Sequence, residues 1–374
     1  MSDPCRQESA SRRALALVSG GLDSALAVRV LLDQGVSVTA LHFVSVFSPG
    51  RDPAGRLAAR EVTRALGVPL IVKDATRAML GFVPEPRYGW GRHVNPCIDC
   101  RVHHLREAKA MLKNLGAQYV ATGEVLGQRP MSQHREALTR VERESGLEGL
   151  VLRPLSALNL DPTVPEREGW VDRARLLGIS GRGRSEQNDL ARRWGLTGYT
   201  APAGGCLLTD PNFAWKMQDL LNWEGALTPR DAHLMKLGRH FRLACLRACD
   251  SAHRQADSRL PARVVVGRNE RENAKLVTFR RAGDWLLVAA GGRSPETLLV
   301  GSGDAAPDSM RNSLSTAARL TARYCGGRDL PEVEIVARPA VEGEPVPSEE
   351  GEVRLTVAPA GDEEVARLQV RREG

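Results

Sequence analysis

The chain has 374 residues, of which 42% are apolar and 26% charged; this is the range of globular proteins, and the length predicts two or three domains. No run approaches the ~20 apolar residues of a membrane helix, and the polar segment 1–13 does not resemble a secretory signal, so we expect a cytoplasmic protein without membrane contact. The net charge is +7, although residues 331–374 hold eleven acidic residues against five Arg. A basic body before an acidic end favours a polyanionic partner, nucleic acid first; a solubilising surface is the alternative.

Short apolar runs and helical patterns alternate along the first two hundred residues. This alternation predicts an α/β domain with a doubly wound parallel sheet. The predicted strands are 14–18, 36–43, 69–72 and 118–121, and the predicted helices are 24–33, 54–66 and 105–115. Ligands bind at the carboxyl ends of the strands in such sheets.

The rest of the chain changes in character. We expect a flexible terminus over 1–12, the α/β domain over 13–222, a smaller α+β domain over 223–328, and an acidic C-terminal extension over 329–374. Within that extension a loop-like stretch, rich in Pro, Glu and Gly, precedes a segment that adds a strand or remains mobile.

A glycine-rich turn joins the first predicted strand to the first helix. Its glycines allow a tight bend that exposes N–H groups toward an anion, and the following helix adds its positive dipole end. Asp23 is a candidate for holding Mg²⁺ or orienting a pyrophosphate. The chain has neither a Walker nor a Rossmann fingerprint, and a plain strand–turn–helix connection is the alternative. The candidate anion ligands are Ser19, Gly20, Gly21, Asp23 and Ser24.

The pattern Ser-Gly-Gly-x-Asp-Ser after a buried strand resembles the PP-loop ATP-pyrophosphatases. Their activity implies cleavage of ATP between the α and β phosphates and transfer of an adenylate to a carbonyl-type oxygen. Residues 122–133 and 150–155 add a resemblance to tRNA 4-thiouridine synthetases and tRNA 2-thiouridylases. That resemblance implies that Thr122, Gly123 and Gln128 lie near the nucleotide, supported by Ser132 and Gln133. A loop with structural glycines is the alternative for 122–133.

Two features of 4-thiouridine synthetases are missing from the pattern. We see no room before Ser19 for their N-terminal RNA-binding domains, and no rhodanese-like segment afterwards to carry a persulfide. RNA docking and sulfur delivery are therefore expected to differ here.

Seven cysteines, an odd number, are expected to be mostly reduced in the cytoplasm. Cys97 and Cys100 form a C-x-x-C pair at a helix start, and Cys206 follows a glycine turn. Three thiolates can hold a [4Fe–4S] cluster with one open iron, as some thiolation enzymes of this superfamily do. The alternatives are a persulfide and resolving pair, activated by the helix dipole, or a zinc or structural role with His103 or His104 nearby. We expect no role for Cys5, Cys245, Cys249 and Cys325.

Two further segments point to RNA. Gly181-Arg182-Gly183-Arg184 could reach a phosphate backbone, or could be a solvated surface. Residues 266–276, with Asp284-Trp285, resemble the NFACT-type RNA-binding module, which would supply tRNA docking; a structural or protein-binding module is the alternative.

Together these features predict ATP-dependent tRNA uridine thiolation. Asp23, Cys97, Cys100 and Cys206 are the candidate catalytic residues, and the three cysteines are also the candidate metal ligands. The expected cofactors are ATP, Mg²⁺ and a [4Fe–4S] cluster; the expected partners are tRNA and a sulfur donor, either sulfide or a cysteine desulfurase system. The alternatives are a PP-loop ligase that amidates a small metabolite and a non-catalytic RNA-binding adaptor.

Overall fold

The computed structural model divides into two compact units, residues 1–209 and 210–374, which are described separately. The structure describes residues 12–48, 57–199, 205–243, 262–301, 307–341 and 351–371. None of the helices in these ranges combines the length and apolar character needed to cross a bilayer.

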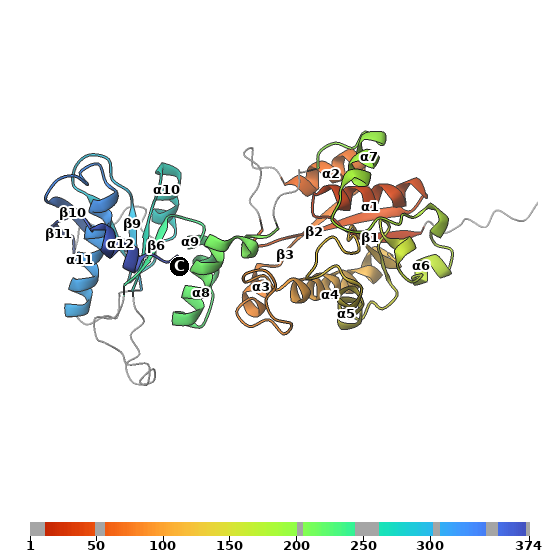
Figure 1. The fold of residues 1–374 in the computed structure, drawn as a ribbon, viewed down its shortest axis with the longest axis horizontal. Helices are drawn as coiled ribbons and strands as arrows, with labels where there is room; N and C mark the ends of the chain where they lie inside the picture. Colours follow the sequence, from red (N-terminus) through yellow and green to blue (C-terminus); the bar gives the residue numbers. More distant parts are fainter. Residues whose placement is uncertain are drawn as a thin grey trace, which may run out of the picture. The chain divides into compact units, whose positions relative to one another are not determined.

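The first unit is built on a parallel sheet of five strands, in the order β3-β2-β1-β4-β5 (Figure 1). The strands are β1 (Arg13–Leu17), β2 (Ser37–Val44), β3 (Leu70–Asp74), β4 (Tyr119–Thr122) and β5 (Val151–Leu152). The α-helices are α1 (Leu22–Asp33), α2 (Ala58–Leu66), α3 (Thr76–Phe82), α4 (Cys97–Leu115), α5 (Arg135–Ser145), α6 (Val164–Arg167) and α7 (Ser185–Arg193). Short 3₁₀ turns lie at η1 (Ala157–Asn159), η2 (Arg173–Arg175) and η3 (Leu207–Thr209).

Helices cover both faces of this sheet, as predicted for a doubly wound fold. Successive side chains of a strand point to opposite faces. Ala14 and Ala16 of β1 therefore pack with α1, α2 and α7, whereas Leu15 packs with α4 and α5. Figure 1 shows these two helical layers on either side of the strands. The parallel pairing brings the carboxyl ends of β1, β2 and β4 to one edge, where ligands bind in such sheets.

The second unit contains an antiparallel sheet of six strands, in the order β11-β10-β8-β9-β7-β6. The strands are β6 (Arg239–Arg242), β7 (Arg263–Val266), β8 (Trp285–Ala289), β9 (Thr297–Val300), β10 (Val333–Pro339) and β11 (Val353–Val357). The helices are α8 (Pro211–Glu224), α9 (Pro229–Leu234), α10 (Glu270–Thr278), α11 (Pro307–Tyr324) and α12 (Asp362–Leu368).

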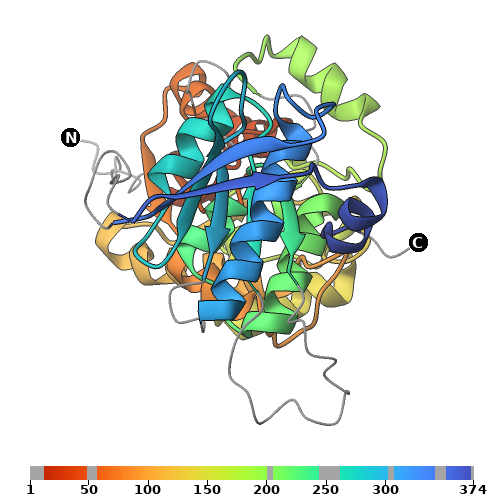
Figure 2. The ribbon, with the colours of Figure 1, turned by 90° about the vertical axis from the view of Figure 1, so that its left-hand side faces the viewer.

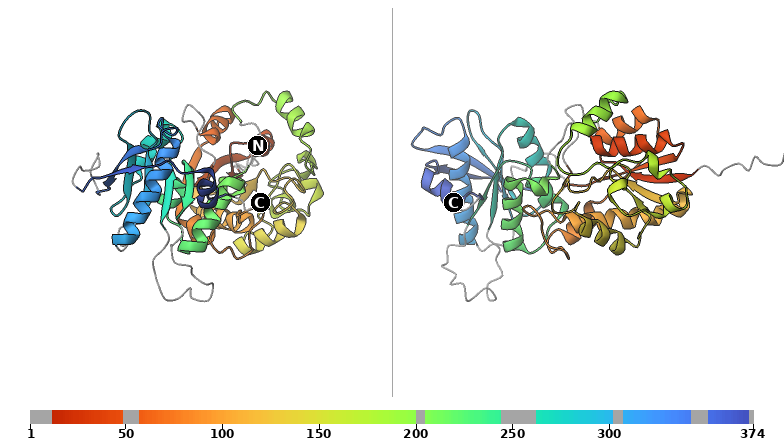
Figure 3. Two further views of the ribbon diagram at one scale, coloured as in Figure 1. Left: turned by 60° about the vertical axis from the view of Figure 1, so that its left-hand side comes forward. Right: turned by 45° about the vertical axis from the view of Figure 1, so that its right-hand side comes forward.

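Both faces of the second sheet are also covered. The long helix α11 lies across one face (Figure 2), where Leu320 packs among strand residues such as Leu287 and Ile335. α9 and α10 lie on the other face (Figure 3), where Leu234 and Leu276 pack on Val265. The unit is the smaller α+β architecture expected after the PP-loop-like region.

The unit boundaries differ from the expected ones. α8 belongs to the second unit, and its first turn is capped by Asp210, which accepts a hydrogen bond from the amide of Phe213. The acidic end supplies β10 and β11, so it is part of the sheet. Its alternating apolar residues were obscured in the sequence by the Pro- and Glu-rich stretch between these strands. The predicted loop residues 342–350 lie outside the described residues.

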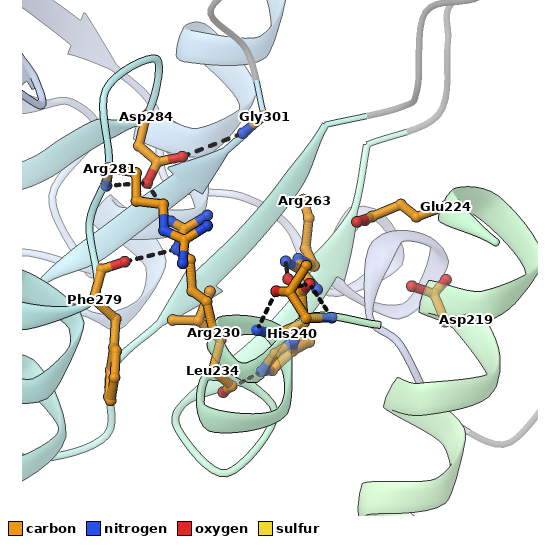
Figure 4. Close-up of polar contacts among 12 residues, drawn as sticks. Asp219, Glu224, Arg230, Leu234, His240, Arg263, Phe279, Arg281, Asp284 and Gly301 are labelled. Carbon is orange, nitrogen blue, oxygen red and sulfur yellow. Dashed lines mark hydrogen bonds and ion pairs between the residues drawn. The ribbon is translucent and has the colours of Figure 1, made fainter. Parts of the chain in front are cut away.

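Buried ion pairs hold α9 against the second sheet (Figure 4). Arg230 pairs with Asp284, which is 3% exposed and also accepts backbone hydrogen bonds from Arg281 (2.8 Å) and Gly301 (3.4 Å). Asp284, the first residue of the Asp-Trp pair noted in the sequence, therefore has a structural role.

Replacing Asp284 with alanine is expected to destabilise the second unit by about 3 kcal/mol, because the Arg230 guanidinium would stay buried without its counter-charge. Urea unfolding of the full chain measures this loss. Asp329→Ala is the control, since the Asp329 side chain is 91% exposed. An Asp284→Ala protein as stable as the control would contradict this interpretation.

Candidate functional site

The glycine-rich turn is closed by hydrogen bonds among its own residues. The Ser24 hydroxyl donates to the Gly21 carbonyl oxygen over 2.8 Å, and the Ser19 amide donates to the Ser24 hydroxyl over 3.3 Å. The Gly21 amide donates to the Ser19 hydroxyl over 3.3 Å. The turn is thus a preformed bend at the N-terminus of α1, where backbone amides and the helix dipole favour an anion.

Two glycines in this region are required by close backbone contacts. Gly20 has φ +86°, and a Cβ there would lie 2.6 Å from the Ala59 amide nitrogen. Gly123, just after β4, abuts the turn, because a Cβ there would lie 2.5 Å from the Ser24 amide nitrogen. Gly123 therefore touches the turn, while the expected proximity of Thr122 and Gly123 to a nucleotide stays a prediction.

Asp23 receives two polar contacts from segments far away in the sequence. The Gln128 side-chain amide and the Arg184 guanidinium donate to Asp23 Oδ2 over 3.2 Å and 3.3 Å. The other carboxylate oxygen, Oδ1, is buried and has no hydrogen-bond partner. Arg184, considered above for an RNA backbone, thus lies at the turn, while Arg182 is exposed. The free oxygen of Asp23 is the kind of hard ligand that Mg²⁺ prefers.

A buried ionic network continues from Gly123. Glu124 pairs with Arg101 of α4 and, over 3.0 Å, with Arg153, whose side chain is 3% exposed. Thr122 donates its hydroxyl to Glu124, and Arg153 also pairs with Glu142 of α5. A chain of direct contacts therefore leads from the turn through Gly123 and Glu124 to Arg101.

Arg101 lies directly after the C-x-x-C pair, and Cys206 comes within electrostatic range of that pair. Burial raises the pKa of Cys100 to about 12, and the charges of Cys206 and Cys97 add to the increase. Burial also raises the pKa of Cys206 to about 11, with Cys97 again contributing. The charges of Cys97, Cys100 and Cys206 therefore act on one another although the residues come from two distant segments.

The high thiol pKa values weigh against thiols activated by a helix dipole, which the persulfide alternative assumes. A helix N-terminus was expected to lower a thiol pKa, but at Cys100 and Cys206 burial dominates, so both thiols stay protonated at neutral pH. A metal ion would displace these protons, because the thiolate is the ligand.

His104 lies beside Cys100, with Nε2 3.7 Å from Sγ, and its ring stacks on Phe43 with the centroids 4.1 Å apart. Burial lowers the pKa of His104 to about 3, so the imidazole is neutral. Within the described ranges, no three His, Cys, Asp or Glu side chains are arranged to hold a metal ion. This finding applies to the predicted histidines and to Cys97, Cys100 and Cys206 alike, so the zinc and the cluster interpretations both stay predictions.

Of the four other cysteines, Cys325 is buried in the second unit, and its thiol donates to the Ala322 carbonyl oxygen. Cys5, Cys245 and Cys249 lie outside the described residues. Ser132 and Gln133 are buried, and the Gln133 carbonyl oxygen accepts from the Gly127 amide, so they support the loop that carries Gln128.

Sequence reasoning missed Arg101, Glu124, His42 and the coupling of Arg184 to Asp23. His42 Nδ1–H donates to the Val18 carbonyl oxygen over 2.7 Å, just after the end of β1. Each of these residues stands next to a recognised motif, but its partner is more than twenty positions away. No local pattern in the sequence carries that information.

The NFACT-like stretch has structural explanations for its most distinctive residues. Asn269 caps α10 by accepting from the Glu272 amide over 3.0 Å. A Cβ at Gly267 would lie 2.0 Å from Asn273 Oδ1 and 3.3 Å from the Glu296 carbonyl oxygen, so the Asn273 side chain packs directly on this glycine. These residues shape the turn between β7 and α10, and the motif alone does not reveal an RNA contact.

Two family comparisons match separate parts of the chain. Residues 9–164 match the family described as thiamine biosynthesis protein (ThiI). Residues 254–367 match the family described as NFACT protein RNA binding domain. The chain thus joins a ThiI-like region to an NFACT-type region. The expected resemblance is confirmed, and the NFACT match extends through most of the acidic end.

Curated relatives match the ThiI-like region. The tRNA-specific 2-thiouridylase MnmA of Syntrophotalea carbinolica is 36% identical over 121 residues, which are 30% of this chain and 34% of that protein. The same enzyme of Xanthobacter autotrophicus is 29% identical over 164 residues, which are 41% of this chain and 42% of that protein. The chain spans about a third of the length of the first of these relatives.

Two solved structures match the chain with low sequence identity and low TM-scores. A 4-thiouridine synthetase in complex with RNA and ATP is 23% identical, with a TM-score of 0.34, over 50% of this chain and 41% of that one. The C-terminal part of the fibronectin/fibrinogen-binding protein of Streptococcus suis has a TM-score of 0.24 and 13% identity, over 73% of this chain and 90% of that one.

Proposed function

We propose that this protein is an ATP-dependent tRNA uridine thiolase. The observation that carries the proposal is the contact chain from the glycine-rich turn through Gly123 and Glu124 to Arg101, which directly follows Cys100 and interacts electrostatically with Cys97 and Cys100. An anion-binding bend and a thiol cluster within one unit suit a reaction that first activates an oxygen and then replaces it with sulfur. The matches to ThiI and MnmA proteins support tRNA thiolation, and the NFACT-type match supports RNA as the partner.

ATP is proposed to bind with its phosphates at the turn of residues 19–24. The backbone amides and the dipole of α1 would hold the phosphate charge. Asp23 fits a Mg²⁺ ion, because Oδ1 is buried without a partner while Oδ2 is held by Gln128 and Arg184. Arg184 is also placed to neutralise charge on the leaving pyrophosphate.

Cys97, Cys100 and Cys206 are proposed to hold a [4Fe–4S] cluster. The donor set fits in kind, since three free, partly exposed cysteines are the ligands that such a cluster with one open iron requires. When bound, the cluster would supply an iron that can hold a sulfide. Arg101, beside the thiols, would offset the negative charge of the three thiolates.

The proposed reaction has two displacement steps. A uridine carbonyl oxygen attacks the α-phosphorus of ATP; the P–O bond to the β-phosphate breaks, and pyrophosphate leaves. A sulfur nucleophile then attacks the base carbon that carries the adenylate, the C–O bond breaks, and AMP leaves with both electrons of that bond. AMP is a far better leaving group than oxide, so one hard substitution becomes two easier ones.

Variants of two of the three cysteines test whether the thiols act in sulfur transfer and not in ATP cleavage. In Cys100→Ala and Cys206→Ala, thiolated nucleoside from tRNA, ATP and sulfide is expected to fall at least about tenfold, whereas tRNA-dependent pyrophosphate release persists. Nucleoside mass analysis and a pyrophosphate assay measure the two steps on anaerobically prepared protein. Cys325→Ala, in the second unit, is the matched control.

Several results would count against the proposal. Pyrophosphate release that ignores tRNA would point to a small-metabolite ligase. RNA binding without any ATP cleavage would point to an adaptor. A Cys206→Ala protein with full thiolation and wild-type iron and acid-labile sulfide would exclude Cys206 as a ligand and as a sulfur carrier.

A further inference from the structure

An exposed tryptophan stands in the loop that leads into the C-x-x-C pair. Trp90 is 41% exposed, although large aromatic side chains are usually well buried. Its indole N–H donates to the Val83 carbonyl oxygen over 2.8 Å, so the polar edge of the ring is fixed to the protein. The ring is thus anchored at one edge while much of its surface remains in solvent.

The glycines on either side leave space around the indole. A Cβ at Gly89 would meet no heavy atom within 4 Å. A Cβ at Gly91 would lie 3.3 Å from the Asn95 carbonyl oxygen and 3.7 Å from the Met131 side chain. Trp90 therefore has no side chain on either neighbouring residue in the sequence.

The loop is tied to the cysteine pair itself. Asp99, which lies between the two cysteines, accepts hydrogen bonds from the amides of Arg87 (3.0 Å) and Tyr88 (3.3 Å). On the other side of Trp90, the Gly91 amide donates to the Asn95 carbonyl oxygen over 2.8 Å, two residues before Cys97. The backbone on both sides of Trp90 is therefore fixed to the segment that carries the cysteine pair.

Basic and apolar residues lie on the Trp90 loop and on the segment that approaches it at Gly91 through Met131. We define the Trp90 patch as Trp90, Arg92, Arg129 and Met131. Both arginines are exposed, and neither forms an ion pair with a carboxylate of the described residues. Arg129 is near enough to Cys206 to lower its pKa, and Met131 is 55% exposed. The patch thus offers one ring, two free cations and no carboxylate.

The backbone next to Trp90 is also unusual. His93 has φ +59° and, within the described ranges, is the one residue other than glycine with a positive φ. Non-glycine residues in this region cluster at ligand sites, where the surroundings impose the conformation.

We propose that Trp90 is a stacking platform for a base next to the target uridine in a single-stranded loop of the RNA substrate, with Arg92 and Arg129 holding the flanking phosphates. This inference rests on the proposed function and names how its substrate is positioned. RNA loops are recognised by bases splayed onto aromatic rings, and guanidinium groups bind phosphate oxygens. A protein partner would be matched less well, because the patch is small and carries only positive charge.

Stacking of a neighbouring base would also fix the register of the strand. The uridine could then enter between the glycine-rich turn and the thiols, while the next base stays outside on the indole. Trp90 is thus a positioning residue: it touches a flanking base and not the reacting atoms.

Three variants test this role: Trp90→Ala, Trp90→Phe and the control Leu158→Ala. Leu158 is 48% exposed in the same unit and lies outside the Trp90 patch. The substrate is a tRNA transcript, and a short stem-loop that contains the modified site serves as the binding probe. Affinity for ATP without RNA is the folding check for every variant.

Trp90→Ala is expected to weaken RNA binding and raise KM for RNA by about 5- to 100-fold, the range for loss of one base–aromatic stack. The change should fall on KM more than on kcat. Trp90→Phe should keep most of the affinity, because phenylalanine still stacks. RNA should quench the fluorescence of the wild-type protein, and Trp90→Phe should lose that quenching although it binds. Leu158→Ala should match the wild type.

Two outcomes would overturn the proposal. In one, Trp90→Ala binds RNA as the wild type does, with unchanged KM. In the other, Trp90→Ala is impaired only when a sulfur-donor protein replaces free sulfide, which would make the patch a protein-docking surface. If the wild type proves unable to thiolate RNA, the quenching and affinity measurements still decide whether a base stacks on Trp90, so the two proposals can fail separately.

Discussion

A Gly123→Ala variant is expected to release pyrophosphate from ATP about 100-fold more slowly than the wild type. The added Cβ would lie 2.5 Å from the Ser24 amide nitrogen and 2.6 Å from the Asp23 carbonyl carbon, so the turn itself must move. These neighbours are backbone atoms, which cannot rotate away as a flexible side chain could. A displacement of about 1 Å at a phosphate-binding bend can cost roughly 100-fold in rate. Pyrophosphate release with tRNA present, and ATP affinity, measure the effect.

The same substitution should cost only about 1–3 kcal/mol of stability, because it overpacks one contact and opens no cavity. A folded protein with a damaged turn is therefore expected. Gly81→Ala is the matched control, since a Cβ at Gly81 would meet nothing within 4 Å. Wild-type pyrophosphate release from Gly123→Ala would show that the turn does not hold the phosphates.

The parallel sheet could be predicted because its signals are local. The apolar run at β1 ends at the turn, and a helical pattern follows at once, so strand, bend and helix were placed within about two residues. The thiol cluster was predictable for another reason. Buried cysteines are few, and a C-x-x-C pair together with Cys206 in a glycine turn already suggested a shared ligand.

The connection between turn and thiols could not be predicted. It depends on Glu124 lying between Arg101 and Arg153, and on Gly123 touching Ser24, which are contacts between residues 23 to 99 positions apart. The direction in which the thiol pKa values shift could not be predicted from the sequence either. A helix N-terminus and burial act in opposite directions, and only the packing shows that burial wins at Cys100.

Arg153 is expected to be the most costly side chain to remove from the first unit. It is 3% exposed and pairs with two carboxylates, Glu124 and Glu142, in the interior between β4, β5 and α5. Arg153→Met keeps much of the volume but removes the counter-charge of both acids. The loss of one partner of a buried pair costs about 3–5 kcal/mol, and the upper end is expected here because two acids are affected.

Urea unfolding of Arg153→Met, of Glu124→Gln and of the double variant measures this coupling. The double variant should recover part of the loss, because it no longer buries an unpaired carboxylate at Glu124. Arg143→Met is the control, since the Arg143 side chain is 63% exposed and its pair with Glu144 should be worth at most about 1 kcal/mol. If Arg153→Met and the control are equally stable, the ionic network does not hold Glu124 in place. That result would also leave Arg101, and through it the thiols, without the fixed position on which the proposed sulfur transfer depends.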